Sequence, residues 1–431
     1  MDERKLAICI PTYDRPDIIE ELLKKSMETY SKFNFDLYIY DSSDNNKTQL
    51  ITNEWQVKFY NLYYVSIDPE MHSNIKVYKI FQQYGLRNKY DYIWVCGDAI
   101  RWSIKVVQKI ADSINNNYDI ISLNYRDEEK IGDKEYTDKN EIFHELAWHF
   151  TLYGAVVLNT NTILNDVNWE VMVEKYDKPD SVNFSHVGFY FEKLCEMDSI
   201  KVMNFSFSKY VLTSSILKEV SGWTQEVFFV WGVAWPNLIN ALPECYTDKA
   251  EVIRKNGIYS KVLNIEAFIS YRRADIINLR TYLKYKEIWE KVTYVSKIKI
   301  LSISITPIIV INMFLKTLIN IKSIKQSKII RKFCKKYKEI YIYGAGRIAM
   351  NYDKLFKRLH LEYKGFVVSE SNENSESFLE HPVIELDELD NKKGEVGIII
   401  ALNSLNYDAV RPKLEKMNIM DAVYYSFNNK S

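Results

Sequence analysis

The sequence predicts an α/β protein in which a mainly parallel sheet is followed by a basic helical segment and a second, smaller α/β domain. Three observations support this class. The first 130 or so residues alternate apolar strand-like runs with helical patterns, as sheets built from right-handed strand–helix–strand units do. A second alternating block begins near residue 337, and an uncharged stretch inside a basic region separates the two blocks. Because 431 residues exceed the size of one ordinary core, we expect more than one domain.

The first block contains five strand-like runs with helical patterns between them. Several runs are apolar throughout, which is typical of strands buried between two helical layers. In the helix expected at 17–30, Ile18, Ile19 and Leu22 share an apolar face, and Glu21 falls elsewhere. The strand-like runs are LAICIP (6–11), DLYIYDSS (36–43), LYYVSI (62–67), DYIWVCGD (91–98) and DIISLNYR (119–126).

Acidic side chains stand at the ends of these runs. The second run ends in Asp41, the third leads to Asp68 and the fourth ends in Asp98, while the first continues into PTYDR (11–15). Parallel sheets bind ligands at the carboxyl ends of their strands. We therefore expect these carboxylates to converge on one crevice, where a cation or hydrogen-bond donors must make their like charges tolerable.

From about residue 150 the alternation fails. YGAVVLNTN (153–161) continues the sheet, and the chain to about residue 280 mixes aromatic and polar residues, most densely over 221–246. Two interpretations of these aromatic side chains stay open. Trp and Tyr faces near a crevice suit sugar rings, but for any single Trp in this stretch we expect core packing.

Charge and cysteine content limit the choice of partners. Lys plus Arg and Asp plus Glu number 57 each, so the net charge indicates no nucleic-acid partner.

The N-terminal MDERKLAICIP has no charged-then-apolar leader, so we expect no secretion signal. Without a C-x-x-C pair, we expect reduced thiols in a cytosolic compartment. The five cysteines are Cys9, Cys96, Cys195, Cys245 and Cys334.

A basic segment, assigned to 284–336, follows the first domain. Its uncharged core, 300–315, has 16 residues and is interrupted by Pro307, whereas a membrane span needs about 20. From Lys284 to Lys338 the chain has fourteen Lys or Arg and two acids. This pattern fits an interfacial helical element on an anionic membrane surface. A buried inter-domain helix with a solvated basic neighbour is the other interpretation.

The second block, 337–431, predicts a small Rossmann-like domain. In EIYIYGAGRIA a strand runs into a glycine turn and a helix, and Gly344, Gly346 and Ala349 match G-x-G-x-x-A. This context suits a dinucleotide fingerprint, whose acid at the end of the next strand would be Glu370. No dehydrogenase catalytic partner is evident, so a structural or nucleotide-sensing role is favoured over hydride chemistry, and we do not expect NAD(P).

Three motifs in order carry a resemblance to a known family. ICIPTYDRP, IYDSSDN and YDYIWVCGDAI resemble the nucleotide-sugar half of bacterial family 2 glycosyltransferases with a GT-A fold, of the capsule or surface-polysaccharide type. The resemblance covers about residues 5–125. It implies a glycosyltransferase domain over 1–283, with the nucleotide-sugar half at about 1–130 and the acceptor half at 131–283. The C-terminal block resembles the small Rossmann-like domains appended to such enzymes.

The resemblance also implies roles for individual residues. Thr12, Tyr13 and Arg15 would line the nucleotide pocket, and Asp41 would hydrogen-bond the uracil or ribose of the donor. Asp98 would bind the diphosphate through Mg²⁺ or Mn²⁺, for which carboxylate oxygen is a natural ligand.

The sequence departs from the family pattern at this metal motif. A D-x-D pair would place a second acid two residues from Asp98, but Gly97, Ala99 and Ile100 surround it. A lone carboxylate can still hold a metal whose other ligands are phosphates and waters, so the metal remains an expectation.

Four further residues are candidates with alternatives. Lys76, near a helix N-terminus, could meet the diphosphate or be a solvated lysine. Arg101 could neutralise phosphate or form a surface salt bridge. Inverting transfer needs a base for the acceptor hydroxyl; in place of the family's E-D pair, the corresponding window offers Asp180 and His186, whose unperturbed pKa lies near neutrality.

The resemblance therefore implies an inverting, hexosyltransferase-type enzyme that moves a sugar from a UDP-sugar to a saccharide, which we expect to be lipid-linked. We expect it in the cytoplasm, peripheral on the inner face of the plasma membrane, with homo-oligomerisation left open. The alternative is an NAD(P)-linked oxidoreductase or nucleotide-binding regulator that acts through Gly344 and Gly346. Nucleotidyl transfer is a third interpretation, which the lack of a glycine-rich triphosphate loop near the N-terminus disfavours.

Overall fold

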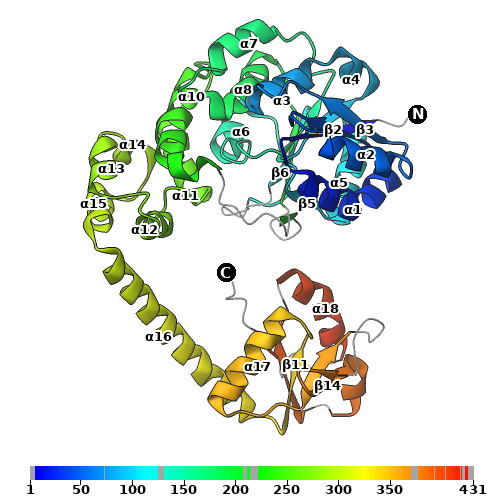
Figure 1. Ribbon diagram of the computed structural model, residues 1–431, viewed down its shortest axis with the longest axis vertical. Helices are drawn as coiled ribbons and strands as arrows, with labels where there is room; N and C mark the ends of the chain where they lie inside the picture. The colour runs from blue at the N-terminus through cyan, green and yellow to red at the C-terminus, as the bar shows by residue number, and fades with distance from the viewer. Residues whose placement is uncertain are drawn as a thin grey trace. The chain divides into compact units, whose positions relative to one another are not determined.

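The computed structural model of the protein forms two compact units, Met1–Ile308 and Ile309–Ser431, each described here by itself (Figure 1). The structure describes residues 5–71, 73–124, 131–206, 211–213, 222–369, 377–392, 394–402, 404–417, 419 and 423–425.

A mixed sheet forms the centre of the first unit. Its strand order is β3-β2-β1-β4-β8-β6-β9-β7. The strands β3, β2, β1 and β4 are parallel, and β8 runs antiparallel to both β4 and β6. The predicted α/β class with a mainly parallel sheet is confirmed. The strands are β1 (Leu6–Thr12), β2 (Asp36–Asp41), β3 (Leu62–Ser66), β4 (Tyr92–Val95), β6 (Ile120–Asn124), β7 (Lys134–Tyr136), β8 (Val156–Asn159) and β9 (Val202–Ser206). A separate pair joins β5 (Ile100–Trp102) to β10 (Val211–Thr213).

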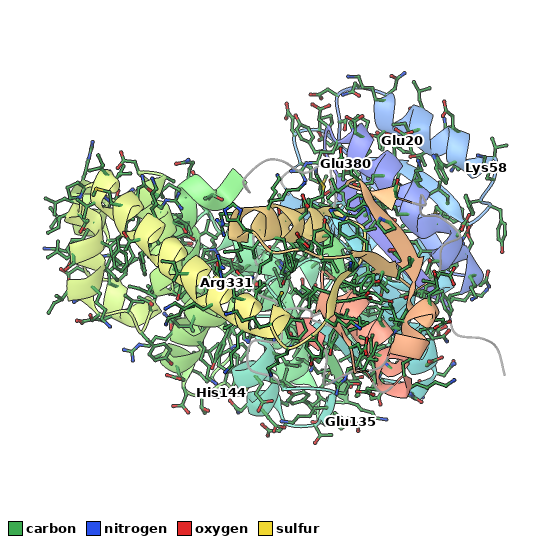
Figure 2. The ribbon with its side chains drawn as sticks, turned by 90° about the horizontal axis from the view of Figure 1, so that it is seen from below. Glu20, Lys58, Glu135, His144, Arg331 and Glu380 are labelled. Carbon is green, nitrogen blue, oxygen red and sulfur yellow. A yellow bond between two sulfur atoms is a disulfide. The ribbon has the colours of Figure 1, made fainter. Side chains whose placement is uncertain are left out.

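Two hydrophobic layers cover the parallel half of this sheet. Ile8 of β1 packs into one buried cluster, and its neighbour Cys9 packs into the other, because successive side chains of a strand point to opposite faces. The first layer contains the predicted apolar face of α1, including Ile19 and Leu22. Figure 2 shows Glu20 of the same helix among the labelled charged side chains, and it is exposed. The helices here are α1 (Pro16–Lys32), α2 (Lys47–Gln56), α3 (Ser73–Gln82), α4 (Tyr84–Lys89) and α5 (Ile104–Ser113).

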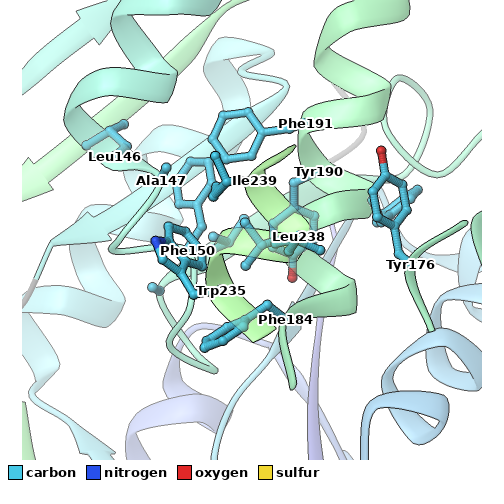
Figure 3. Close-up of a cluster of buried hydrophobic side chains, with 14 of the residues drawn as sticks. Leu146, Ala147, Phe150, Tyr176, Phe184, Tyr190, Phe191, Trp235, Leu238 and Ile239 are labelled. Atoms are coloured by element: carbon cyan, nitrogen blue, oxygen red, sulfur yellow. The ribbon is translucent and has the colours of Figure 1, made fainter. Parts of the chain in front are cut away.

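The aromatic-rich part of the first unit is core. Phe184, Tyr190 and Trp235 pack together at the centre of one buried cluster (Figure 3). Trp231 and Trp235 are 8% and 0% exposed, so neither can offer its face to a sugar ring, and core packing is the correct interpretation for both. The helices are α6 (Lys139–Leu146), α7 (Trp169–Tyr176), α8 (Ser185–Glu196), α9 (Val227–Phe229), α10 (Trp235–Ala241), α11 (Lys249–Tyr259), α12 (Ile265–Arg273), α13 (Leu279–Lys284), α14 (Trp289–Val292) and α15 (Lys297–Ile305).

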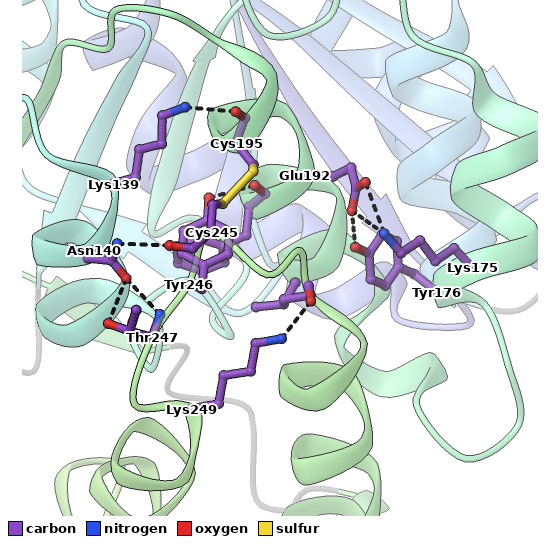
Figure 4. The surroundings of a disulfide bond; sticks show 12 residues. Lys139, Asn140, Lys175, Tyr176, Glu192, Cys195, Cys245, Tyr246, Thr247 and Lys249 are labelled. Atoms are coloured by element: carbon purple, nitrogen blue, oxygen red, sulfur yellow. Dashed lines mark hydrogen bonds and ion pairs between the residues drawn. A yellow bond between two sulfur atoms is a disulfide. The ribbon is translucent and has the colours of Figure 1, made fainter.

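A disulfide bond links two of the five cysteines. Cys195 at the end of α8 is bonded to Cys245 after α10, 50 residues later in the chain (Figure 4). Lys139 Nζ and Asn140 Nδ2 donate hydrogen bonds to the carbonyl oxygens of Cys195 and Cys245, at 2.7 and 2.9 Å. The expectation that all five thiols are reduced is therefore wrong for this pair, since the fold of the aromatic region brings them together.

The first unit continues beyond residue 283. It includes α14 and α15, which the sequence analysis assigned to the basic segment. Among the described helices no single one is long and apolar enough to cross a membrane; α15 and 308–317 pass that test only as a pair, interrupted at Pro307. Apolar side chains just after this break are exposed, with Ile309 at 69% and Met313 at 65%.

The second unit combines a long helix with a six-stranded sheet. The strand order is β13-β14-β12-β11-β15-β16, and β11 is parallel to both of its neighbours. The predicted strand, glycine turn and helix lie where the sequence places them, as β11 and α17. The elements are α16 (Ile308–Cys334), β11 (Glu339–Tyr343), α17 (Arg347–Leu359), β12 (Gly365–Val368), β13 (Ser377–Phe378), β14 (His381–Glu385), β15 (Val396–Ile400), α18 (Ser404–Lys416) and β16 (Val423–Tyr425).

Candidate functional site

The carboxyl ends of β1, β2 and β4 bring charged side chains together. Thr12 and Asp41 are register partners at the ends of β1 and β2. Asp98 follows β4 and is only 7% exposed. Its carboxylate accepts hydrogen bonds from Thr12 Oγ1 at 3.0 Å and from Arg15 Nη1 at 3.2 Å. The first and fourth strand ends therefore meet at Asp98, as the sequence pattern indicated.

The turn after β1 places Arg15 over Asp98. Asp14 adopts a left-handed conformation, with φ of 48°, which aspartate tolerates better than most residues. Its amide donates to Ser43 Oγ at 2.8 Å, so the turn is tied to the segment after β2. Arg15 then caps α1 through its backbone, and Pro16 begins the helix without a donor to satisfy.

Asp41 is held by donors that sequence reasoning missed. Its carboxylate accepts hydrogen bonds from the amide and hydroxyl of Ser43 and from the Tyr64 hydroxyl at 3.1 Å. Burial, and then the Asp41 carboxylate, raise the pKa of Tyr64 to about 12, so this phenol remains a donor at neutral pH. Tyr64 pairs in register with Ile39, so its contact with Asp41 follows from the parallel register of β2 and β3, for which neither strand carries a sequence signal.

Lys76 lies inside this group of charges. It is 6% exposed, so the solvated-lysine interpretation is wrong. Its ammonium donates to Ser42 Oγ and stands 5.5 Å from the centre of the Tyr13 ring. Burial lowers the pKa of Lys76, while Asp41 and Asp98 act in the opposite direction. Tyr13 itself is 52% exposed, so its ring lies between a buried cation and the surface only in part.

Arg101 supports the backbone at Asp98 and does not face the group of charges there. Its side chain is 3% exposed and forms an ion pair with Glu21 at 3.5 Å. The guanidinium also donates to the carbonyl oxygens of Ile18, at 2.8 Å, and of Asp98. Both interpretations of Arg101, as a phosphate partner and as a surface salt bridge, are therefore corrected: it ties the backbone at Asp98 to α1.

The residues present fit a divalent cation in only one way. Asp98 is a hard oxygen ligand, but no acid flanks it, and the residues that the structure describes contain no group of three His, Cys, Asp or Glu that could hold a metal ion. A closed protein site is therefore not formed. Asp98 fits as a single ligand to Mg²⁺ or Mn²⁺, whose remaining positions phosphates and waters would fill.

The two candidate bases lie apart from the hydrogen bonds around Asp98. His186, in α8, is 2% exposed and packs 4.8 Å from the Tyr153 ring. Burial lowers the pKa of His186 to about 4, so the imidazole is neutral at pH 7. Asp180 is exposed, and its carboxylate accepts a hydrogen bond from Asn237 at 3.1 Å. Tyr78, on the helix of Lys76, donates to the carbonyl of Ser185 at 2.6 Å, so α3 packs directly against α8.

The glycine turn of the second unit has different requirements at its two glycines. Gly344 has φ of +102°, and a Cβ there would lie 2.9 Å from Leu402 Cδ2, whereas Gly346 has open space around it. Ala349 is fully buried against the sheet, as close packing of helix on strand requires. Glu370, the expected acid, lies outside the described residues.

A cavity of about 660 Å³ in the second unit lies at the opposite ends of the strands from Gly344. It is bounded by residues that precede or begin β11, β12 and β14, and by α17. Among its lining residues are Tyr337, Lys338, Asp353, Lys357, Tyr363 and His381.

Comparison with protein-family models and with curated proteins gave no match. Among solved structures, the chain is similar to TarS 1–349 of S. aureus, with a TM-score of 0.40 and 11% identity over 67% of this chain and 88% of that one. It is similar to the mannosyltransferase PcManGT of Pyrobaculum calidifontis in complex with GDP-Man and Mn²⁺, with a TM-score of 0.35 and 8% identity over 69% and 86%. Glucosyl-3-phosphoglycerate synthase of Mycobacterium tuberculosis, in complex with Mn²⁺, UDP-Glc and phosphoglyceric acid, matches with a TM-score of 0.36 and 9% identity over 56% and 81%.

Proposed function

We propose that the protein is an inverting glycosyltransferase of the GT-A type that uses a UDP-sugar as donor. The observation that carries the proposal is the meeting of Thr12, Arg15, Lys76 and Asp98 at the carboxyl edge of a parallel sheet. Such an edge is where open α/β sheets bind ligands. Two cations beside a carboxylate suit a diphosphate, which needs positive charge, together with a metal ion, which needs an oxygen ligand.

Each residue would have a separate task in donor binding. Asp98 would hold Mg²⁺ or Mn²⁺, which when bound neutralises charge on the leaving diphosphate. Lys76 would donate to a phosphate oxygen from a site that Tyr13 partly shields from water. Asp41, oriented by Ser43 and Tyr64, would accept a hydrogen bond from the uracil or ribose. Thr12 keeps the Asp98 carboxylate in place.

Sugar transfer with inversion also needs a base for the acceptor hydroxyl. We propose Asp180 and His186 as the candidates. His186 is 2% exposed and burial lowers its pKa to about 4, so it would be a weak base at neutral pH, and Asp180 is the stronger candidate. Asp180 is exposed, so an acceptor hydroxyl could reach its carboxylate.

The acceptor we propose is a lipid-linked saccharide in bacterial capsule or surface-polysaccharide assembly, on the inner face of the plasma membrane. Fourteen basic residues over 284–338, with exposed Ile309, Met313 and Phe314 among them, favour contact with an anionic membrane surface. Phe314→Ser, which removes apolar surface without adding charge, should weaken binding to anionic phospholipid vesicles, whereas Leu50→Ser, at an exposed site on α2, should not. Equal binding of both variants and wild type would contradict the membrane proposal.

Isothermal titration calorimetry tests the donor proposal. UDP should bind the whole protein in the presence of Mn²⁺, and Asp98→Ala should remove the effect of Mn²⁺. NAD⁺, titrated in parallel, should give no heat. Binding of NAD⁺ but not of UDP would overturn the proposal and assign the function to the second unit.

A further inference from the structure

We propose that the donor and the divalent cation each raise the affinity of this site for the other, because Arg15 pairs with the metal-ligand carboxylate in the free protein and moves to the diphosphate when both bind. The inference rests on the proposed donor site and concerns how that site is filled. Arg15 would then have two successive partners. It pairs with Asp98 in the free protein and with the diphosphate when the donor is bound.

The first observation is that both oxygens of Asp98 already accept a hydrogen bond, one of them from a cation. Arg15 Nη1 lies 3.2 Å from Oδ1, and Thr12 Oγ1 lies 3.0 Å from Oδ2. Each oxygen keeps a lone pair for a metal ion, but the guanidinium beside Oδ1 repels a divalent cation at that carboxylate. Of the two donors, Arg15 is the one able to leave, since its side chain is 47% exposed, whereas Thr12 is 3% exposed at the end of β1.

The second observation is that the charged side chains around Asp98 already have no net charge. The carboxylates of Asp41 and Asp98 are matched by the cations of Arg15 and Lys76, and Lys76 interacts with both carboxylates. The nearby Arg101 is paired with Glu21. A divalent cation alone would add two positive charges beside Lys76, and a nucleotide-sugar diphosphate alone would add two negative charges beside Asp41 and Asp98. Uncompensated charge at a largely buried site is costly.

Joint binding avoids both costs. The two charges of the cation and the two of the diphosphate cancel, and the guanidinium released from Asp98 finds phosphate oxygens, which its planar fork suits. Thermodynamic linkage then requires that the donor raise cation affinity by the same factor as the cation raises donor affinity.

Electron paramagnetic resonance of free Mn²⁺ measures this coupling once the Mn²⁺ held by UDP alone, determined without protein, is subtracted. In wild type, we expect saturating UDP to raise Mn²⁺ affinity by about tenfold or more, within the usual range of coupling between sites. In Arg15→Gln, Asp98 is released, so Mn²⁺ should bind more tightly without UDP than it does in wild type, and the UDP effect should shrink. Lys24→Gln removes an exposed cation from α1, the helix that Arg15 precedes, and should behave as wild type.

The outcomes are distinguishable. If UDP binds but leaves Mn²⁺ affinity unchanged, the coupling is overturned while the donor site stands. If Arg15→Gln couples as strongly as wild type, the role of Arg15 is overturned. If UDP binds neither with nor without Mn²⁺, the proposed function falls and this inference with it. Arg15 makes no side-chain cap to α1, and Arg15→Lys, which keeps the charge, provides a second variant.

Discussion

Both units contain a parallel strand that runs into a turn and then a helix, yet the two turns have different chemistry. In the first unit, β1 leads through Asp14 and Arg15 into α1, and the turn is bonded to the neighbouring strand end at Ser43. In the second unit, β11 leads through Gly344 and Gly346 into α17, where open space surrounds the second glycine.

The strand ends beside the two turns differ in the same way. Around Asp98 the strand ends contribute carboxylates and a buried ammonium, which bond to one another. Beside Gly344, the hydroxyls of Tyr343 and Ser369 bond to each other at 2.5 Å. A parallel sheet provides a binding edge in either case, but only the side chains at that edge decide what it can bind. The comparison therefore favours the first unit as the place of the proposed donor site, and four predictions test it.

The largest effect should come from Asp98→Ala. This change removes the proposed metal ligand and leaves Arg15 and Lys76 with Asp41 as the one carboxylate remaining of the pair, so sugar transfer should fall by about 100- to 1,000-fold or more. Initial rates with a UDP-sugar at saturating Mn²⁺ measure the loss. Transfer that persists at the wild-type rate would mean that the edge of the first sheet is not the donor site.

A smaller effect is expected for Lys76→Met. The variant keeps the stem of the side chain but loses a charge-assisted hydrogen bond to phosphate, worth about 1.5–3 kcal/mol, so UDP affinity should fall by roughly 10- to 100-fold. Calorimetry measures the change, with Lys24→Met, an exposed site on α1, as the control. Unchanged affinity would show that the buried ammonium serves only Asp41, Asp98 and the fold.

A still smaller effect should appear as a pH dependence. Because burial lowers the pKa of Lys76, the free protein loses this ammonium at a pH below the ordinary 10.5, and bound diphosphate should raise the pKa again. UDP affinity should be full while Lys76 is protonated and should fall as pH rises through its lowered pKa. The fall can reach about tenfold for each unit by which diphosphate raises that pKa. Lys76→Met should lose this dependence and keep only the titration of the uracil ring.

The sequence predicts those parts of this site that local patterns determine, and fails for contacts between segments that lie far apart in the chain. Strands and helices follow from local periodicity, so both sheets and the position of Asp98 after β4 were predictable. The contact of Tyr64 with Asp41 depends on the register between two strands, which the pattern of either strand alone does not contain.

Long-range packing explains the remaining differences. Within their own segments the patterns of Arg101 and Glu21 suggest surface charges, but α1 and β5 bury the two side chains as a pair. The bond between Cys195 and Cys245 spans 50 residues without a recognisable spacing. For Trp231 and Trp235, composition could not separate a sugar platform from a core until the helices were placed.

The smallest effect on donor binding should come from the glycine turn of the second unit. Gly344→Ala forces a side chain into a left-handed backbone and against Leu402, which should destabilise the second unit by about 1–3 kcal/mol. Gly346→Ala, where φ is −130° and nothing lies within 4 Å, should change stability by less than about 0.5 kcal/mol. Neither variant should alter UDP affinity.

The tryptophans allow the unfolding of the two units to be measured separately. All nine lie before residue 290 and so report only on the first unit, whereas circular dichroism reports on both. In urea, Gly344→Ala should lower the midpoint of an unfolding transition seen by circular dichroism and leave the tryptophan fluorescence midpoint unchanged. If both midpoints move together, the two units unfold as one, and a substitution at the glycine turn can reach the donor site through stability alone. If only the circular dichroism midpoint moves and UDP affinity nevertheless falls, the second unit takes part in donor binding. The contrast between the two sheet edges would then be wrong.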